Sequence, residues 1–163
     1  MSPQVLDDAF NRVSFDRELV FKFFIAFSLV EKALKQTSFR RVDPGGDVHP
    51  NWEVFSQTID GNVNYQANPQ LATAVAYLLQ HPPGKQVWRN NQLAFEQTQR
   101  PPGLSDTEWL SLLVRRVRNN LFHGSKFSFD RHRDTLLIQF SLVILEEWAL
   151  CHPDILVILQ SIQ

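Results

Sequence analysis

The chain has 163 residues, of which 44% are hydrophobic and 20% charged, a composition that predicts one folded domain over residues 1–163. The formal net charge of −1 does not favour a nucleic-acid partner, so any anion-binding site must come from a local cluster of basic residues. Cys151 is the only cysteine, which excludes a disulfide within the chain and a cysteine-rich zinc site.

The apolar stretches of the chain do not have the pattern of a membrane protein. Charged residues interrupt them at Lys22, Glu31 and Glu146, which disfavours a membrane span. The first residues, Met-Ser-Pro-Gln, lack the charged segment and apolar run of a signal peptide. We therefore expect a cytoplasmic protein with no membrane partner.

A long amphipathic helix is expected from about Asp16 to Thr37. Ser14 or Asp16 can cap its start, because a short side-chain oxygen accepts a hydrogen bond from a backbone N–H of the first turn. Apolar residues then recur at intervals of three and four, on one face of a helix: Val20, Phe23, Phe24, Phe27, Val30 and Leu34.

The middle of the chain alternates turns with shorter elements. Residues 43–47, Asp-Pro-Gly-Gly-Asp, predict a loop, and a short helix is expected after Asn51. Asn68-Pro69 is typical of a helix start, with the helix ending at Pro82-Pro83-Gly84. Alternation of period two is nearly absent, so strands are not favoured, and residues 85–102 are interpreted as a connector that could hold a short helix.

The last third of the chain predicts three further helices. Ser105 and Glu108 fit a capping box, in which each side chain bonds the other's backbone N–H, and Gly124 is the expected end of that helix. Strongly apolar residues predict a helix over about 131–150, and Pro153 opens a final helix to about residue 161. The expected fold is all-α, an up-and-down bundle of four to five main helices with short accessory helices.

A polar cluster ends the capping-box helix. The window from Leu112 to Gly124 places three arginines, two asparagines and a histidine beside an apolar helical stripe. Arg118, Asn119 and His123 within it form an Arg-Asn-x-x-x-His motif, and Gly124 follows. This motif resembles the hallmark of the HEPN superfamily, an Arg and a His separated by four to six residues on a helix of a small bundle. The aromatic-rich first helix, with its internal Glu31, is also similar to that of related chains.

The arginine of the motif has a second candidate. Arg116 lies seven positions before His123, about two helical turns, so the two would share one face of an ideal helix. Arg118 and His123 would be turned about 140° apart by the same geometry. We choose Arg118 because Asn119 follows it, and a distorted last turn or a second subunit would complete the site.

The resemblance implies a metal-independent endoribonuclease without a cofactor, possessing a composite site in a homodimer. Arg118, Asn119 and His123 would be catalytic: His123 exchanges protons, Arg118 grips phosphate, and Asn119 orients either by hydrogen bonds. RNA would be cut through its own 2′-OH to a 2′,3′-cyclic phosphate and a 5′-hydroxyl. A bacterial toxin or phage-defence effector fits this activity, with an antitoxin or a nucleotidyltransferase as protein partner.

Neighbouring residues are assigned supporting roles. Arg115, Arg116 and Asn120 are candidate substrate-binding residues. Glu31 is costly to bury without a partner, so we expect it to pair with an arginine of the motif helix and to fix that side chain.

Plainer interpretations compete with these roles. The arginines could form a solvated face near a helix end, and His123 could be a helix cap. Arg40 and Arg41 could contact RNA or belong to a solvated loop, and the other histidines, His49 among them, show no metal-ligand spacing. The alternative function is a non-catalytic HEPN-like module that binds nucleotides, RNA or a partner, and a purely structural helical dimer is the third possibility.

Overall fold

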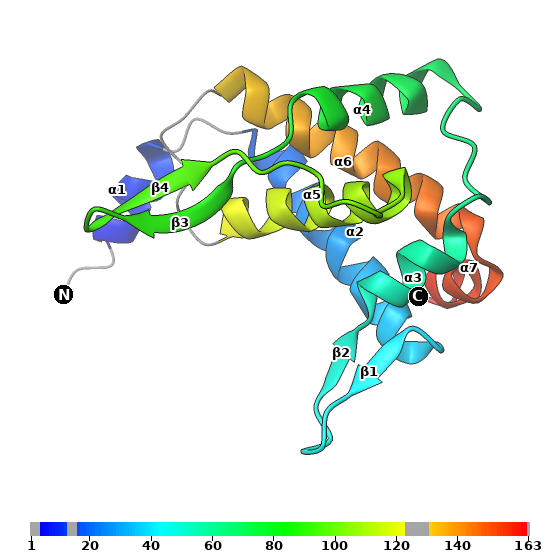
Figure 1. Cartoon of the computed structure of the whole chain (residues 1–163). Coiled ribbons are helices and arrows are strands. Elements are labelled where there is room, and N and C mark those ends of the chain that lie inside the picture. Colours follow the sequence, from blue (N-terminus) through cyan, green and yellow to red (C-terminus); the bar gives the residue numbers. More distant parts are fainter. Residues whose placement is uncertain (1–3, 13–15, 123–130, 163) are drawn as a thin grey trace.

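The computed structural model describes residues 4–12, 16–122 and 131–162, in which seven helices and two antiparallel hairpins follow one another (Figure 1). The helices are α1 (Gln4–Arg12), α2 (Arg17–Gln36), α3 (Trp52–Ile59), α4 (Pro69–Gln80), α5 (Asp106–Phe122), α6 (Arg131–Cys151) and α7 (Pro153–Gln160). The strands are β1 (Arg40–Val42), β2 (Val48–Pro50), β3 (Lys85–Arg89) and β4 (Gln92–Glu96).

Helix α6 lies at the centre of the helical packing. It contacts α2, α4, α5 and α7 (Figure 1). Its Ile144, Leu145 and Trp148 are almost completely buried, and they join Phe23 of α2 and Leu113 of α5 in a single core cluster. The apolar stripes expected from helical spacing therefore face one another, and their burial is the main force that holds these helices together.

The helix starts follow the predicted caps. Asp16 accepts a hydrogen bond from the Leu19 N–H at 3.1 Å, and Asn68 accepts one from the Leu71 N–H at 2.7 Å. Both bonds satisfy a donor that the first helical turn leaves unpaired. Asp16 is thus confirmed as the cap of α2, while the alternative Ser14 lies outside the described residues.

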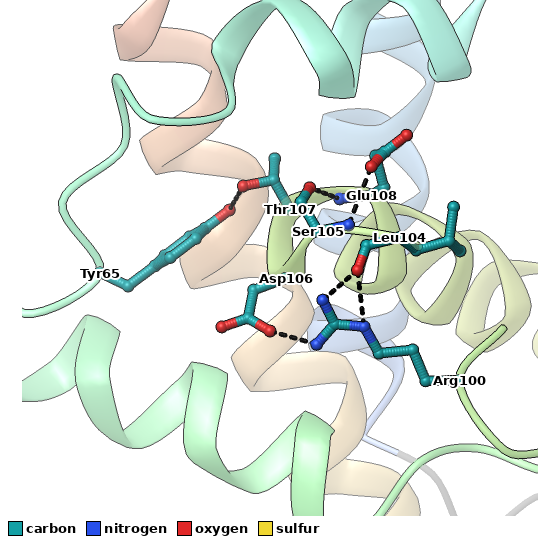
Figure 2. A network of polar contacts seen from close by, with 7 residues as sticks. All are labelled: Tyr65, Arg100, Leu104, Ser105, Asp106, Thr107 and Glu108. Carbon is teal, nitrogen blue, oxygen red and sulfur yellow. Dashed lines mark hydrogen bonds and ion pairs between the residues drawn. The ribbon is translucent and has the colours of Figure 1, made fainter. Parts of the chain in front are cut away.

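The capping box at the start of α5 is also confirmed. Glu108 N–H donates to Ser105 Oγ at 3.2 Å, and Ser105 N–H donates to Glu108 Oε2 at 2.9 Å (Figure 2). Arg100 adds hydrogen bonds to the Leu104 carbonyl and the Asp106 carboxylate (Figure 2). The helix that carries the motif therefore begins at a well-anchored point.

The two hairpins correct the all-α expectation. Residues 85–102 hold no helix, because β3 and β4 pair in antiparallel register from Lys85–Glu96 to Arg89–Gln92. Their turn residues Asn90 and Asn91 have φ values of 50° and 59°, the left-handed pair that matches the twist of a two-residue hairpin. The protein is largely α-helical, with two small antiparallel sheets in addition.

The hairpins lie against the helices that carry the candidate site. Strands β1 and β2 contact α2, and β3 contacts α5 (Figure 1). The β1–β2 hairpin encloses the predicted loop at residues 43–47, whose Gly46 has a φ of 91°. This placement brings side chains of both hairpins toward the polar cluster of α5.

Candidate functional site

A cleft of about 670 Å³ opens beside the polar cluster of α5. Residues of α2, β1, β2, α3, β3 and α5 line it, with Phe27, Trp52 and Leu112 among the apolar ones. We call this cavity the basic cleft. Its charged and titratable lining residues are Glu31, Arg41, His49, Lys85, Arg115, Arg116 and Arg118.

The basic cleft concentrates positive charge in a chain whose formal net charge is −1. In the part of the chain that the structure describes, its lining contains five Lys or Arg side chains and one His, against the single carboxylate of Glu31. Such a concave surface of one sign focuses the electrostatic potential and attracts anions. The local cluster that an anion site requires is therefore present.

Arg118 and Asn119 lie together at the wall of the cleft. Arg118 Nη1 donates to Asn119 Oδ1 at 3.0 Å, and the guanidinium lies 5.6 Å from the centre of the Phe27 ring. A cation over an aromatic face is attracted to the ring and restricted in orientation. The predicted motif arginine is thus half-buried and positioned by α2, while Asn119 is exposed.

His123, the third residue of the motif, lies outside the described residues, as does the predicted C-cap Gly124. The last described residue of α5 is Phe122, so His123 follows directly in the chain. The structure therefore gives the setting of Arg118 and Asn119 but no distance to the imidazole.

Arg116, the alternative motif arginine, is bound to two protein acceptors. Its Nη1 donates to the Pro83 carbonyl at 3.2 Å and to Thr98 Oγ1 at 2.7 Å. The guanidinium also lies 5.7 Å from the centre of the Trp109 ring, and burial lowers the pKa of Arg116. Arg116 therefore ties α5 to the chain on both sides of the β3–β4 hairpin.

Arg115 and Glu31 are neighbours across the cleft. Burial lowers the pKa of Arg115, whereas the negative charges of Glu31 and Glu53 raise it. Arg115 Nε donates to the Ser111 carbonyl at 3.3 Å, and the Glu31 carboxylate accepts a hydrogen bond from Trp52 Nε1 at 3.3 Å. The bond that reaches Glu31 comes from an indole and not from an arginine, so the expected pairing is reduced to a charge interaction with Arg115.

Asn120, a predicted substrate-binding residue, has a structural contact instead. Its side chain is only 3% exposed, and its Nδ2 donates to the Gly84 carbonyl at 2.9 Å. Gly84 itself is tightly placed, since an added Cβ would lie 3.1 Å from Phe95 Cβ. Asn120 therefore joins the end of α5 to the start of β3, and we leave it out of the substrate contacts proposed below.

The hairpins contribute cleft residues that sequence analysis did not assign. Lys85 comes from the start of β3, and Arg41 and His49 come from β1 and β2. The Asp43 carboxylate lies 3.0 Å from His49 Nε2 and 3.6 Å from Arg41 Nε. The sequence indicates Arg41 as an RNA contact or a residue of a solvated loop, whereas His49 and Lys85 carry no local signal because they lie far from the α5 motif in the chain.

Among the described residues, no group of three or more His, Cys, Asp and Glu side chains could hold a metal ion. Cys151 lies outside the cleft, and burial, followed by the charge of Glu147, raises its pKa to about 11. A thiol with such a pKa is a poor nucleophile near neutral pH. Across the described ranges, no helix has the length and apolarity to cross a membrane.

Comparison with protein-family models, with curated proteins and with solved structures finds no match to this chain.

Proposed function

We propose that this protein is a HEPN-type, metal-independent endoribonuclease that cleaves RNA through attack of its 2′-OH. The observation that supports this most is the basic cleft at the end of α5, where Arg118 and Asn119 of the Arg-Asn-x-x-x-His motif stand at the wall. A cleft with five Lys or Arg side chains in a chain of net charge −1 fits a polyanionic substrate.

In the proposed reaction the 2′-oxygen loses its proton and bonds to phosphorus, the bond from phosphorus to the 5′-oxygen breaks, and that oxygen takes up a proton. Arg118 donates hydrogen bonds to the phosphate oxygens, where negative charge accumulates in the transition state. His123 exchanges a proton with one of the two oxygens, because imidazole titrates near neutral pH. Asn119 orients the phosphate or the imidazole.

We further propose a homodimer whose helical bundles bring two copies of the motif to one composite site. Next to the cleft residues Phe27 and Glu31, α2 carries Phe21 and Ile25, whose side chains are 64% and 39% exposed. Large apolar side chains this exposed on neighbouring turns are typical of an interaction surface. Light scattering should show a dimer that Phe21→Glu weakens, and a strict monomer at high concentration would contradict the composite site.

The test of the nuclease proposal uses purified wild type, Arg118→Ala and His123→Ala with a 5′-labelled RNA in the presence of EDTA. Wild type should yield fragments ending in 2′,3′-cyclic phosphate, and each variant should lose at least about 100-fold in rate. Arg89→Ala is the matched control, because this exposed arginine pairs with Glu96 at 2.8 Å and does not line the cleft. Undiminished cleavage by both motif variants would end the proposal.

A second candidate is a binding module without catalysis. Arg116 and Asn120 are engaged by protein acceptors, which leaves fewer cleft groups for a reacting phosphate than the motif alone suggests. Such a module would bind RNA or nucleotides in the same cleft, and tight binding without any cleavage would favour it.

A further inference from the structure

The β1–β2 hairpin places an imidazole and a carboxylate together at the wall of the basic cleft. His49 Nε2 lies 3.0 Å from Asp43 Oδ2, and the His49 side chain is 44% exposed. His49 pairs with Arg41 directly across the two strands, so their side chains stand on the same face, and both line the cleft.

The hairpin loop fixes the carboxylate behind the ring. The Asp43 N–H donates to the Asp47 carbonyl at 2.9 Å, and the Gly46 N–H donates to the Asp43 carbonyl at 2.8 Å. Arg41 Nε, 3.6 Å from Oδ1, holds the other carboxylate oxygen. No hydrogen bond joins His49 Nε2 to Asp43, so the carboxylate acts through its charge, which at 3.0 Å stabilises the imidazolium that forms when the ring accepts a proton.

We propose, on the basis of the ribonuclease function above, that His49 is the catalytic base and Asp43 its positioning residue. Neutral His49 takes the proton from the 2′-OH as the oxygen bonds to phosphorus. The phosphorus–5′-oxygen bond breaks, the 5′-oxygen takes up a proton from solvent water, and protonated His49 then returns its proton to the solvent.

The other charged groups of the cleft agree with this assignment. Arg115 and Arg118 of α5 and Lys85 of β3 are cations, which can hold phosphate but cannot act as bases near neutral pH. Among the described residues, Glu31 is the only carboxylate of the lining, and its Oε1 already accepts the indole N–H of Trp52. Within the described lining, His49 is therefore the side chain suited to accept a proton.

The experiment measures single-turnover cleavage and RNA affinity for wild type, His49→Gln, Asp43→Asn and His123→Ala, with His81→Gln as the matched control. His81 is an exposed histidine at the end of α4, outside the cleft. We expect His49→Gln to lower the cleavage rate by about 100-fold or more while RNA affinity changes by no more than about threefold. Asp43→Asn should give a smaller loss of rate.

Two readouts separate a catalytic base from a merely structural residue. The pH profile of the cleavage rate should differ between wild type and His49→Gln, because a general base contributes one limb of such a profile. Added imidazole should restore cleavage to His49→Ala. If His123→Ala abolishes cleavage but His49→Gln retains the wild-type rate and profile, His49 is not the base and the ribonuclease function stands. If wild type binds RNA without cutting it, both proposals fail.

Discussion

Asn120 joins the motif helix to a hairpin through one buried amide. Removing the side chain in Asn120→Ala leaves the Gly84 carbonyl, which its Nδ2 contacts at 2.9 Å, without that donor. We expect the free energy of unfolding to fall by about 1–3 kcal/mol, since a buried acceptor without a partner is costly. Urea unfolding followed by circular dichroism measures this loss.

The neighbouring residue provides the control for this prediction. Asn119 is exposed and its Oδ1 accepts a hydrogen bond from the neighbouring Arg118, so Asn119→Ala should change stability by no more than about 0.5 kcal/mol. Equal urea midpoints for Asn119→Ala and Asn120→Ala would show that Asn120 has no structural role. Asn120 would then again be a candidate substrate contact.

At the same scale, part of the candidate site could be predicted from the sequence and part could not. Arg118 and Asn119 were found because they lie within one short window whose residues share a helix end. His49 and Lys85 reach the same cleft from separate hairpins, and only tertiary packing brings them there. The role of Asn120 was also hidden, because burial against Gly84 depends on the path of a segment that was expected to be a connector.

Among the elements, α5 depends most clearly on its capping box. Ser105→Ala should lower the free energy of unfolding by about 1 kcal/mol, because the Glu108 N–H loses its acceptor. The bond from the Ser105 N–H to Glu108 is the first cause that lowers the pKa of that carboxylate. The stability that this bond contributes is fully present above the pKa of Glu108 in the unfolded chain. It is lost as pH falls through the lower pKa of Glu108 in the folded protein.

Urea unfolding at neutral pH and again near pH 3 measures both effects. Ser161→Ala is the control, since Ser161 is exposed at the end of α7 and caps no helix start. A Ser105→Ala variant as stable as Ser161→Ala would contradict a stabilising role for the box.

The elements also show which local signals were sufficient. Caps and apolar periodicity predicted the starts of α2, α4 and α5, because these signals lie within a few residues of the helix they open. The β3–β4 hairpin was missed since its strands do not alternate cleanly and its two-residue turn, Asn90-Asn91, lacks the glycine that usually marks such turns. The flanking prolines are typical of a connector, and they therefore favour that interpretation over a hairpin.

For the whole molecule, function rests on a contrast between net and local charge. A formal net charge of −1 gives the whole chain no long-range attraction for a polyanion, so RNA binding must come from the basic cleft. Arg41 and Lys85 are exposed cations of the cleft and Arg118 is a half-buried one, and Arg41 also pairs with Asp43 at 3.6 Å. Together they can neutralise about three phosphates of a single strand.

This count predicts how RNA binding depends on salt. With about three phosphates neutralised, the logarithm of the association constant should fall with the logarithm of salt concentration with a slope of about −2. His123→Ala, used to prevent cleavage, would be titrated with single-stranded RNA by fluorescence anisotropy at several salt concentrations. Adding Arg118→Gln should make the slope shallower by about 0.7, the share of one phosphate contact, whereas adding Arg89→Gln outside the cleft should leave it unchanged. If both substitutions made the slope shallower by the same amount, RNA binding would depend on the overall charge of the chain alone. The basic cleft would then not be the RNA-binding site.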